Sequence, residues 1–182
     1  MFVVLRSKCL PLLALVPLMA GCSTWPNFEY APVVVLEDVN LDNDQAQHLG
    51  VLYPLVSVLG NIETTGVEPS TAYSAFGYDE WYSGEEDFYA FNMPDTNALA
   101  LTLQWTSSTT DLDLYLFEYD NETGRLDSLK GDSLTESTLS PEQVVVPGLN
   151  PGVTYVILVA GSSGPATPYE LLIDIQPLGT TS

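Results

Sequence analysis

Two stretches of the chain alternate strictly between apolar and other side chains, and this pattern constrains the fold more than any other feature. In residues 98–105 (ALALTLQW), every second residue is leucine or tryptophan. In residues 111–119 (DLDLYLFEY), leucines alternate with acidic and aromatic residues. Successive side chains of a strand point to opposite faces, whereas an amphipathic helix repeats its apolar residues every third or fourth position. Both stretches therefore predict β-strands.

Further apolar runs are separated by glycine, proline and small polar residues, as strands are by turns. Their β-branched and aromatic residues suit a pleated sheet. Together they predict an all-β fold, a jelly-roll-like antiparallel β-sandwich of about seven to eight short strands. The other predicted strands lie within residues 32–38, 51–63, 85–93, 142–149, 153–161 and 169–177.

The first residues have the layout of an export signal. Arg6 and Lys8 precede an apolar run of roughly a dozen residues, shorter than the about 20 that a membrane-spanning helix needs. The run ends in LMAGC at residues 18–22, which resembles the lipobox of bacterial lipoproteins. The resemblance implies removal of residues 1–21 and lipidation of Cys22, since two or more acyl chains anchor a protein stably.

This signal sets the expected organisation of the chain. Residues 22–31 form a lipidated tether, and residues 32–182 are of a size to form one domain. No disulfide is expected, because Cys9 leaves with the signal and Cys22 is modified. Ser23 after the cysteine favours the outer membrane, with the domain in the periplasm or at the cell surface.

The charge is strongly negative and narrows the range of partners. The chain has 24 acidic residues and four basic ones, two of which lie in the predicted signal. Nucleic acid is excluded as a partner, because its phosphates require a basic protein face. The membrane partner is expected to be reached through the lipid at Cys22.

Several motifs occur in an order that resembles the bacterial pre-peptidase C-terminal (PPC) domain. The resemblance covers about Asp38 to Pro177. It implies a jelly-roll-like sandwich that is not catalytic and usually accompanies exported enzymes. Some members bind calcium near an N-terminal Asn-Asp element, and some bind matrix proteins or polysaccharide. We expect this chain to depart from the family in having no attached enzyme, and Leu41 and Asp42 replace the usual Glu and Pro. The matching residues are Asn43, Asp44, Asp87, Tyr89, Phe91, Asp111, Leu112, Asp113, Leu114, Pro151, Gly152, Tyr155, Tyr169 and Leu171.

Clustered acids and amides suggest a calcium site. Calcium takes six to eight oxygen ligands, and residues 38–44 (DVNLDND) are rich in them. We expect this loop to fold against the sheet and to share Ca²⁺ with acids on the strands. The alternative is a set of solvated carboxylates. The candidate ligands are Asn43, Asp44, Asp87, Asp111 and Asp113.

Two groups of aromatic residues are candidates for ligand binding. Trp81 and Tyr82 lie in a predicted loop, and Tyr115, Phe117 and Tyr119 lie opposite the leucines of one strand. Such rings stack on sugars or anchor a protein partner. The alternative is that they cover the outside of the sheet or pack under a loop.

Catalytic signatures are sparse. The chain has one histidine, His48, and no GxSxG or HExxH motif. The sequence therefore favours a lipid-anchored envelope module that binds an exported protein or a polysaccharide, or that assists a separate exported enzyme. The alternative is a carboxylate-based hydrolase on a jelly roll, because chance pairs of acids are common in so acidic a chain.

Overall fold

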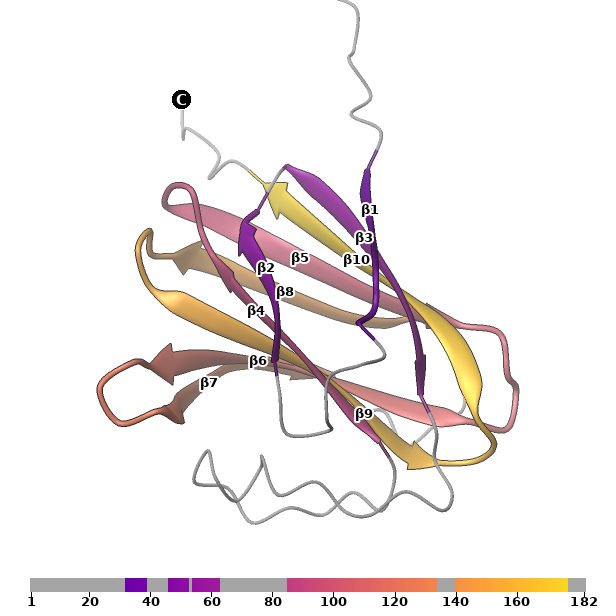
Figure 1. Ribbon diagram of the computed structural model, residues 1–182. Coiled ribbons are helices and arrows are strands. Elements are labelled where there is room, and N and C mark those ends of the chain that lie inside the picture. Colours follow the sequence, from indigo (N-terminus) through magenta and orange to yellow (C-terminus); the bar gives the residue numbers. More distant parts are fainter. Residues whose placement is uncertain (1–31, 39–45, 53, 63–84, 134–139, 177–182) are drawn as a thin grey trace, which may run out of the picture.

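The computed structural model describes residues 32–38, 46–52, 54–62, 85–133 and 140–176. They form ten strands in two five-stranded sheets that pack on each other (Figure 1). The predicted all-β sandwich is confirmed. In this part of the chain, no helix is long and apolar enough to cross a membrane.

Each sheet draws its strands from along the whole chain. Sheet A has the order β1 (Val33–Leu36), β3 (Leu55–Ile62), β10 (Thr167–Gln176), β5 (Asn97–Trp105) and β8 (Glu142–Leu149). Sheet B has the order β2 (Ala46–Val51), β4 (Glu86–Asn92), β9 (Thr154–Ser163), β6 (Asp111–Asp120) and β7 (Arg125–Ser133).

Both sheets are mixed: most pairings are antiparallel, as predicted, and one pairing in each sheet is parallel. β1 pairs with β3 in parallel, and β2 pairs with β4 in parallel. A parallel pair needs a connection that returns to the starting end. Here a strand of the opposite sheet makes that return, because the chain alternates between the sheets from β1 to β4.

The structure contains two strands, β2 and β7, that the sequence did not predict. β2 (AQHLGV) contains a glycine and has no buried residue, and in β7 (RLDSLKGDS) only Leu126 is buried. Both lie at an edge of sheet B and have one neighbour each in that sheet. An edge strand that buries little needs no alternating pattern, so the sequence signal for these strands is weak.

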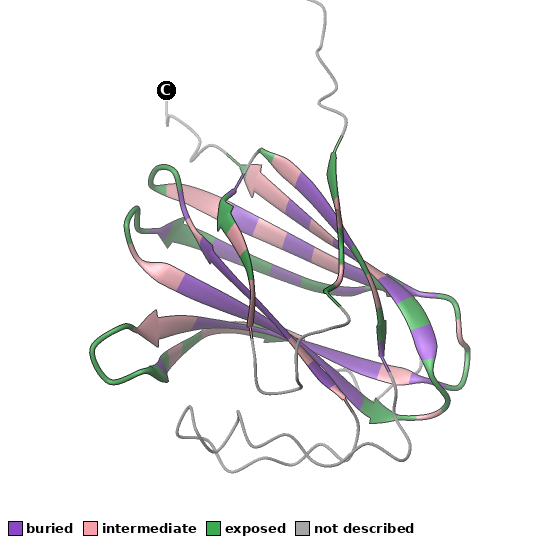
Figure 2. Ribbon diagram, viewed as in Figure 1, coloured by how far each residue is buried: buried purple, intermediate pink, exposed green. Residues whose placement is uncertain are grey.

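The main core fills the space between the sheets, as the alternation predicts. In β5 the buried face is Leu99, Leu101, Leu103 and Trp105, and in β6 it is Leu112, Leu114 and Leu116. Figure 2 shows this alternation as bands of buried and less buried residues along β5. Side chains from both sheets contribute to one cluster.

A second buried cluster lies on the opposite face of sheet B. Its β6 members, Tyr115 and Phe117, alternate with the leucines of the main core and therefore point the other way. The central strands β4, β9 and β6 are thus buried on both faces. The cluster comprises Phe88, Ala90, Tyr115, Phe117, Leu126, Val156, Leu158 and Ala160.

Candidate functional site

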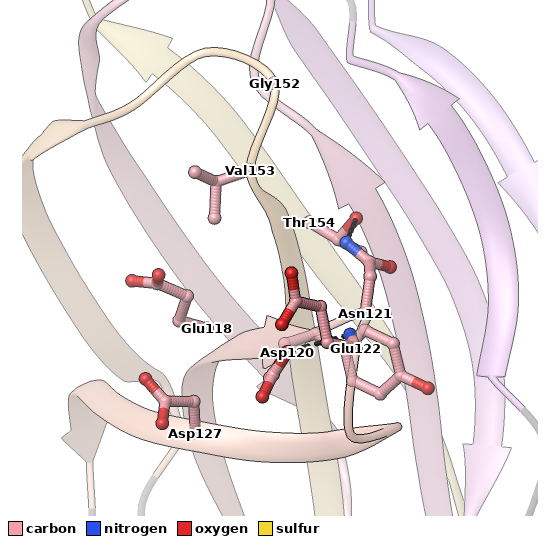
Figure 3. A pocket seen from close by; sticks show the side chains of 9 residues that line it. Glu118, Asp120, Asn121, Glu122, Asp127, Gly152, Val153 and Thr154 are labelled. Carbon is pink, nitrogen blue, oxygen red and sulfur yellow. Dashed lines mark hydrogen bonds between the residues drawn. The ribbon is translucent and has the colours of Figure 1, made fainter.

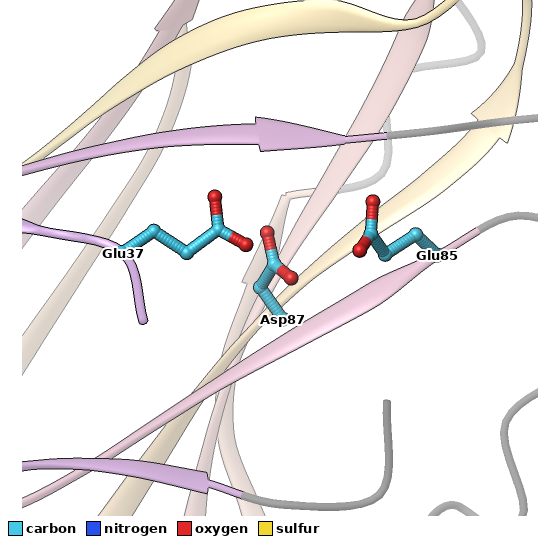
Figure 4. Close-up of side chains that lie close together, drawn as sticks. All are labelled: Glu37, Glu85 and Asp87. Atoms are coloured by element: carbon cyan, nitrogen blue, oxygen red, sulfur yellow. The ribbon is translucent and has the colours of Figure 1, made fainter. Parts of the chain in front are cut away.

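Three carboxylates from different parts of the chain converge at one place between the sheets. Glu37 follows β1 of sheet A, while Glu85 and Asp87 lie at the start of β4 in sheet B. One oxygen of each lies within 4.8 Å of the others. Figure 4 shows the three side chains pointing toward one another. We call these residues the carboxylate cluster.

Backbone hydrogen bonds fix the two acids that flank Asp87. The N–H of Glu37 donates to the carbonyl of Leu59 at 2.9 Å, and Glu37 Oε2 accepts the N–H of Asn61 at 2.7 Å. The carbonyl of Glu85 accepts the N–H of Gly161 at 3.1 Å. Glu37 is therefore held on β3, and Glu85 is held on β9.

Asp87 is held by a tyrosine that reaches across from sheet A. Tyr169 on β10 donates its hydroxyl hydrogen to Asp87 Oδ2 at 2.6 Å, and its oxygen shares a hydrogen bond with the hydroxyl of Tyr89. The Tyr169 ring passes over Gly60 of β3, where a Cβ would lie 2.4 Å from the ring's Cζ. A side chain at position 60 would collide with the ring, so glycine is required for this approach.

Burial and negative charge set the protonation of these groups. Burial raises the pKa of Asp87 well above its ordinary value, and the nearby charge of Glu37 raises it further, against the lowering effect of the Tyr169 hydrogen bond. Burial, followed by the charge of Asp87, raises the pKa of both Tyr89 and Tyr169. The tyrosine hydroxyls thus remain hydrogen-bond donors, and Asp87 takes up a proton more readily than an exposed aspartate does.

The chemistry of the cluster fits a hard divalent cation. All its ligand atoms are carboxylate oxygens, which calcium prefers, with water and carbonyls completing six to eight ligands. Three carboxylates this close repel one another unless they share a proton or a cation. Asp87, Glu37 and Glu85 are the residues that would hold such an ion.

The structure brings one predicted metal ligand into this cluster and leaves two outside it. Asp87 is a member, but Asp111 and Asp113 are not. Asp113 is buried on the face of sheet B that carries Tyr115, whereas Asp87 shares the opposite face with Tyr89. Asn43, Asp44, Trp81, Tyr82 and Cys22 lie outside the described residues.

Sequence reasoning missed Glu37 and Glu85 as members of the cluster. Both stand beside predicted strands, Glu37 directly after the VVVL run and Glu85 before EDFYAF. An acid directly at the end of an apolar strand was the available signal. Only the packing of sheet A on sheet B shows that the end of β1 and the start of β4 meet.

The three aromatic residues of β6 have different environments. Tyr115 and Phe117 are 6% and 1% exposed, and their rings are stacked with centroids 5.9 Å apart. They pack within the second cluster and do not present a surface to a ligand. Tyr119 is only partly buried and packs at the margin of that cluster.

Tyr119 lines an open pocket of about 420 Å³ beside the β6–β7 hairpin. Figure 3 shows carboxylates of Glu118, Asp120, Glu122 and Asp127 around this space. Two of them are already engaged. Asp120 accepts the hydroxyl of Thr123 at 2.7 Å and the N–H of Glu122 at 2.8 Å, and these bonds lower its pKa. Glu118 pairs with Lys130 at 2.5 Å. The pocket is acidic and disfavours an anionic ligand.

His48 on β2 lines a neighbouring pocket of about 370 Å³. The described residues around this pocket include no serine or cysteine that the imidazole could activate as a nucleophile. His48 is also separate from the carboxylate cluster. The arrangement offers polar contacts to a ligand and does not match a Ser-His or Cys-His pair.

The chain matches no protein-family model and no curated protein sequence. Among solved structures, it is similar to the pre-peptidase C-terminal domain of collagenase from Bacillus anthracis, with 13% identity, 74% of this chain and 100% of that chain covered, and a TM-score of 0.48. It is also similar to PliG of Aeromonas hydrophila, a periplasmic inhibitor of g-type lysozyme, with 11% identity, coverages of 72% and 98%, and a TM-score of 0.41. A family 6 carbohydrate-binding module shares 14% identity over 51% of this chain and 67% of that chain, with a TM-score of 0.29.

Proposed function

We propose that this chain is a non-catalytic, lipid-anchored accessory domain of the bacterial cell envelope that binds an exported protein or a polysaccharide and is stabilised by calcium. The observation that carries the proposal is the meeting of Glu37, Glu85 and Asp87 within 4.8 Å at a junction of the two sheets. The resemblance of the motifs to the PPC domain supports the same class of function. Such a domain acts by holding a partner, so its surface and its anchor matter more than a reaction centre.

Calcium at the carboxylate cluster would join the two sheets near the start of the domain. Glu37 follows β1, which lies at the edge of sheet A and, among the described strands, pairs with β3 alone. Three of the four residues of β1 are exposed. A cation bound by Glu37, Glu85 and Asp87 would offset the repulsion among the acids and fix this strand end to β4. The stability of β1 in the sheet would thereby depend on the calcium concentration around the domain.

The anchor determines where such a domain works. About ten residues separate Cys22 from β1 at Val33, and a chain of that length reaches at most about 35 Å. The domain would therefore stay close to the membrane surface that holds the lipid. Confinement of this kind raises the effective concentration of a weak binder at the envelope.

Thermal unfolding of the full chain in detergent tests the calcium proposal. A ligand that binds only the folded state stabilises it by about 2.7 kcal/mol at about a hundredfold excess over Kd. We expect the melting temperature to rise in Ca²⁺ relative to chelator, and not in the same concentration of Mg²⁺, which controls for charge screening. Glu37→Gln and Glu85→Gln should remove the rise, while Asp132→Asn, an exposed acid of β7, should retain it. Equal melting temperatures in Ca²⁺ and chelator would refute the metal site.

A further inference from the structure

The pocket lined by His48 lies on the outer face of sheet B and spans four of its strands. It has a volume of about 370 Å³, within the range of about 300 to 1,000 Å³ that is usual for small-molecule sites. Ala90 and Val156 are buried and form an apolar floor of small side chains. The Tyr119 ring is the aromatic member of the lining that remains partly exposed. The pocket thus combines an apolar base with one accessible ring.

Polar groups at the same pocket are oriented by hydrogen bonds to one another. Asn92 and Asn121 donate their Nδ2 hydrogens to Thr154 Oγ1 at 3.3 and 3.2 Å, and Asn92 also donates to the carbonyl of Val153 at 3.1 Å. Because the Thr154 oxygen accepts two hydrogens, its own hydroxyl hydrogen is directed toward another acceptor. Fixing each Nδ2 also fixes the direction of each amide oxygen. The pocket is therefore lined by one hydroxyl and two side-chain amides that are linked by hydrogen bonds.

Irregularities of two strands set the opposite sides of this pocket. In β2 the register shifts between His48 and Gly50, where Gly50 has a φ of 74°. In β6 the register shifts between Glu118 and Tyr119. Bulges redirect the side chains beside them and are frequent next to functional sites. The two bulges place the His48 imidazole and the Tyr119 ring at one pocket, although they lie on strands that do not pair with each other.

The charge around the pocket restricts the class of ligand. The adjoining hairpin pocket carries Glu118, Glu122 and Asp127 and shares Tyr119, Asn121 and Thr154 with this one. Anions would be repelled, and a purely apolar ligand would leave the amides and the hydroxyl unpaired. Sugar hydroxyls both donate and accept hydrogen bonds, and the C–H face of a pyranose packs against the negative face of an aromatic ring.

We propose that this pocket binds a neutral pyranose unit of a polysaccharide, with the sugar packed on Tyr119 and its hydroxyl groups bonded to Asn92, Asn121 and Thr154. His48 lies at the margin and can donate or accept one further bond. The acids of the hairpin pocket extend the polar surface for the next sugar along the chain. This inference rests on the proposed binding function and assigns to it a ligand class and a site.

Calorimetric titration of the full chain tests the inference, in a detergent without a sugar headgroup. The probes are neutral hexasaccharides of glucose, mannose, galactose and N-acetylglucosamine, with a lysine hexapeptide as the cationic comparison. We expect at least one hexasaccharide to bind. Tyr119→Ala and Asn121→Ala should each weaken that binding about tenfold or more, as truncation of a central contact does. Tyr119→Phe keeps the ring and should bind nearly as well as the parent. Gln143→Ala, an exposed amide on β8 of the other sheet, is the matched control and should change nothing.

Folding and binding are separated by thermal unfolding of every variant. Tyr119 packs against the second cluster, so Tyr119→Ala also removes a packing contact of the fold. Asn121 is exposed in the hairpin, so its variant keeps the test decisive. Failure of all hexasaccharides to bind, or undiminished binding by folded Asn121→Ala and Tyr119→Ala, overturns the pocket assignment. Binding of the lysine peptide alone overturns the ligand class. None of these results affects the calcium response of the melting temperature, which tests the proposed function separately.

Discussion

Replacing Asp87 with Asn should act in opposite directions with and without calcium. Asparagine keeps the shape of aspartate, and its Oδ1 can still accept the hydroxyl hydrogen of Tyr169. In the parent, the Tyr169 hydroxyl oxygen lies 2.6 Å from Asp87 Oδ2. The substitution removes one negative charge from the carboxylate cluster. It also removes one charged ligand from the proposed metal site. Relief of repulsion and loss of the cation are therefore predicted from the same change.

The separation of the acids sets the size of the effect. Two unit charges 4.8 Å apart repel by about 3.5 kcal/mol at an effective dielectric constant near 20 and by about 1 kcal/mol in water. Asp87 is partly buried, so the value in the protein lies between these limits. In chelator, at a pH above the folded-state pKa of Asp87, we expect Asp87→Asn to increase the free energy of unfolding by about 1 to 3 kcal/mol. In millimolar Ca²⁺ it should lose the stabilisation that the parent gains.

The pH dependence follows from the raised pKa of Asp87. The folded chain retains this proton above the pH at which the unfolded chain, with an ordinary aspartate near 3.8, has released it. Stability of the metal-free parent should therefore fall as pH rises from that value through the folded-state pKa. Asp87→Asn removes this contribution, so its advantage in chelator should grow with pH. Calcium competes with the proton, and its apparent affinity for the parent should weaken as pH falls.

Three effects are measured by urea unfolding: the gain in stability in chelator, the loss of stabilisation by Ca²⁺ and the dependence on pH. Parent and variant are compared from about pH 4 to about pH 8, in Ca²⁺ and in chelator. Asp132→Asn is the control for general charge reduction, since this exposed acid of β7 lies outside the carboxylate cluster. The reasoning is refuted if Asp87→Asn in chelator shows no gain in stability over the parent that grows with pH, with an unchanged dependence on urea. It is refuted equally if the control variant shows the same gain.

Three further predictions concern the fold and the anchor. Gly60→Ala should destabilise the domain by about 1 to 3 kcal/mol, because the new Cβ would lie 2.4 Å from the Tyr169 ring. In urea unfolding, Gly60→Ala should cost less stability when Tyr169→Leu is also present. An equal loss of stability in both backgrounds would contradict the contact. Phe117→Ala should destabilise by about 3 to 5 kcal/mol, as expected for a ring that is 1% exposed, and a nearly unchanged melting temperature would show that the second cluster is not a core. Cys22→Ala should move the chain from the membrane pellet to the soluble fraction, and unchanged pelleting would exclude the lipid anchor.

The strand predictions are confirmed most clearly where one face of a strand is buried. Leu99, Leu101 and Leu103 enter the core because a period of two in a strand places them on one side. The same argument did not predict that Tyr115 and Phe117 are buried as well. Alternation separates the two faces of a strand, but it does not tell whether the second face meets solvent.

The candidate sites likewise combine residues that the sequence singled out with residues that only the tertiary structure brings together. Asp87 stood out because it opens an aromatic strand in an acidic stretch. Glu85 lies two residues before it and shares its face of the strand, whereas Glu37 joins them only through the packing of sheet A on sheet B. The pocket of His48, Asn92 and Asn121 has no sequence signal, because it depends on two bulges and on hydrogen bonds to Thr154.

The sequence by itself determined the fold class, most strands, the faces of β5 and β6, and a strongly acidic surface, because side-chain periodicity and charge are local properties of the chain. The tertiary structure alone decided which strand ends meet, that two pairings are parallel, and which aromatic rings are exposed. These features depend on the order of strands in each sheet. That order arises from packing between residues distant in sequence, such as Tyr169 crossing Gly60 to reach Asp87.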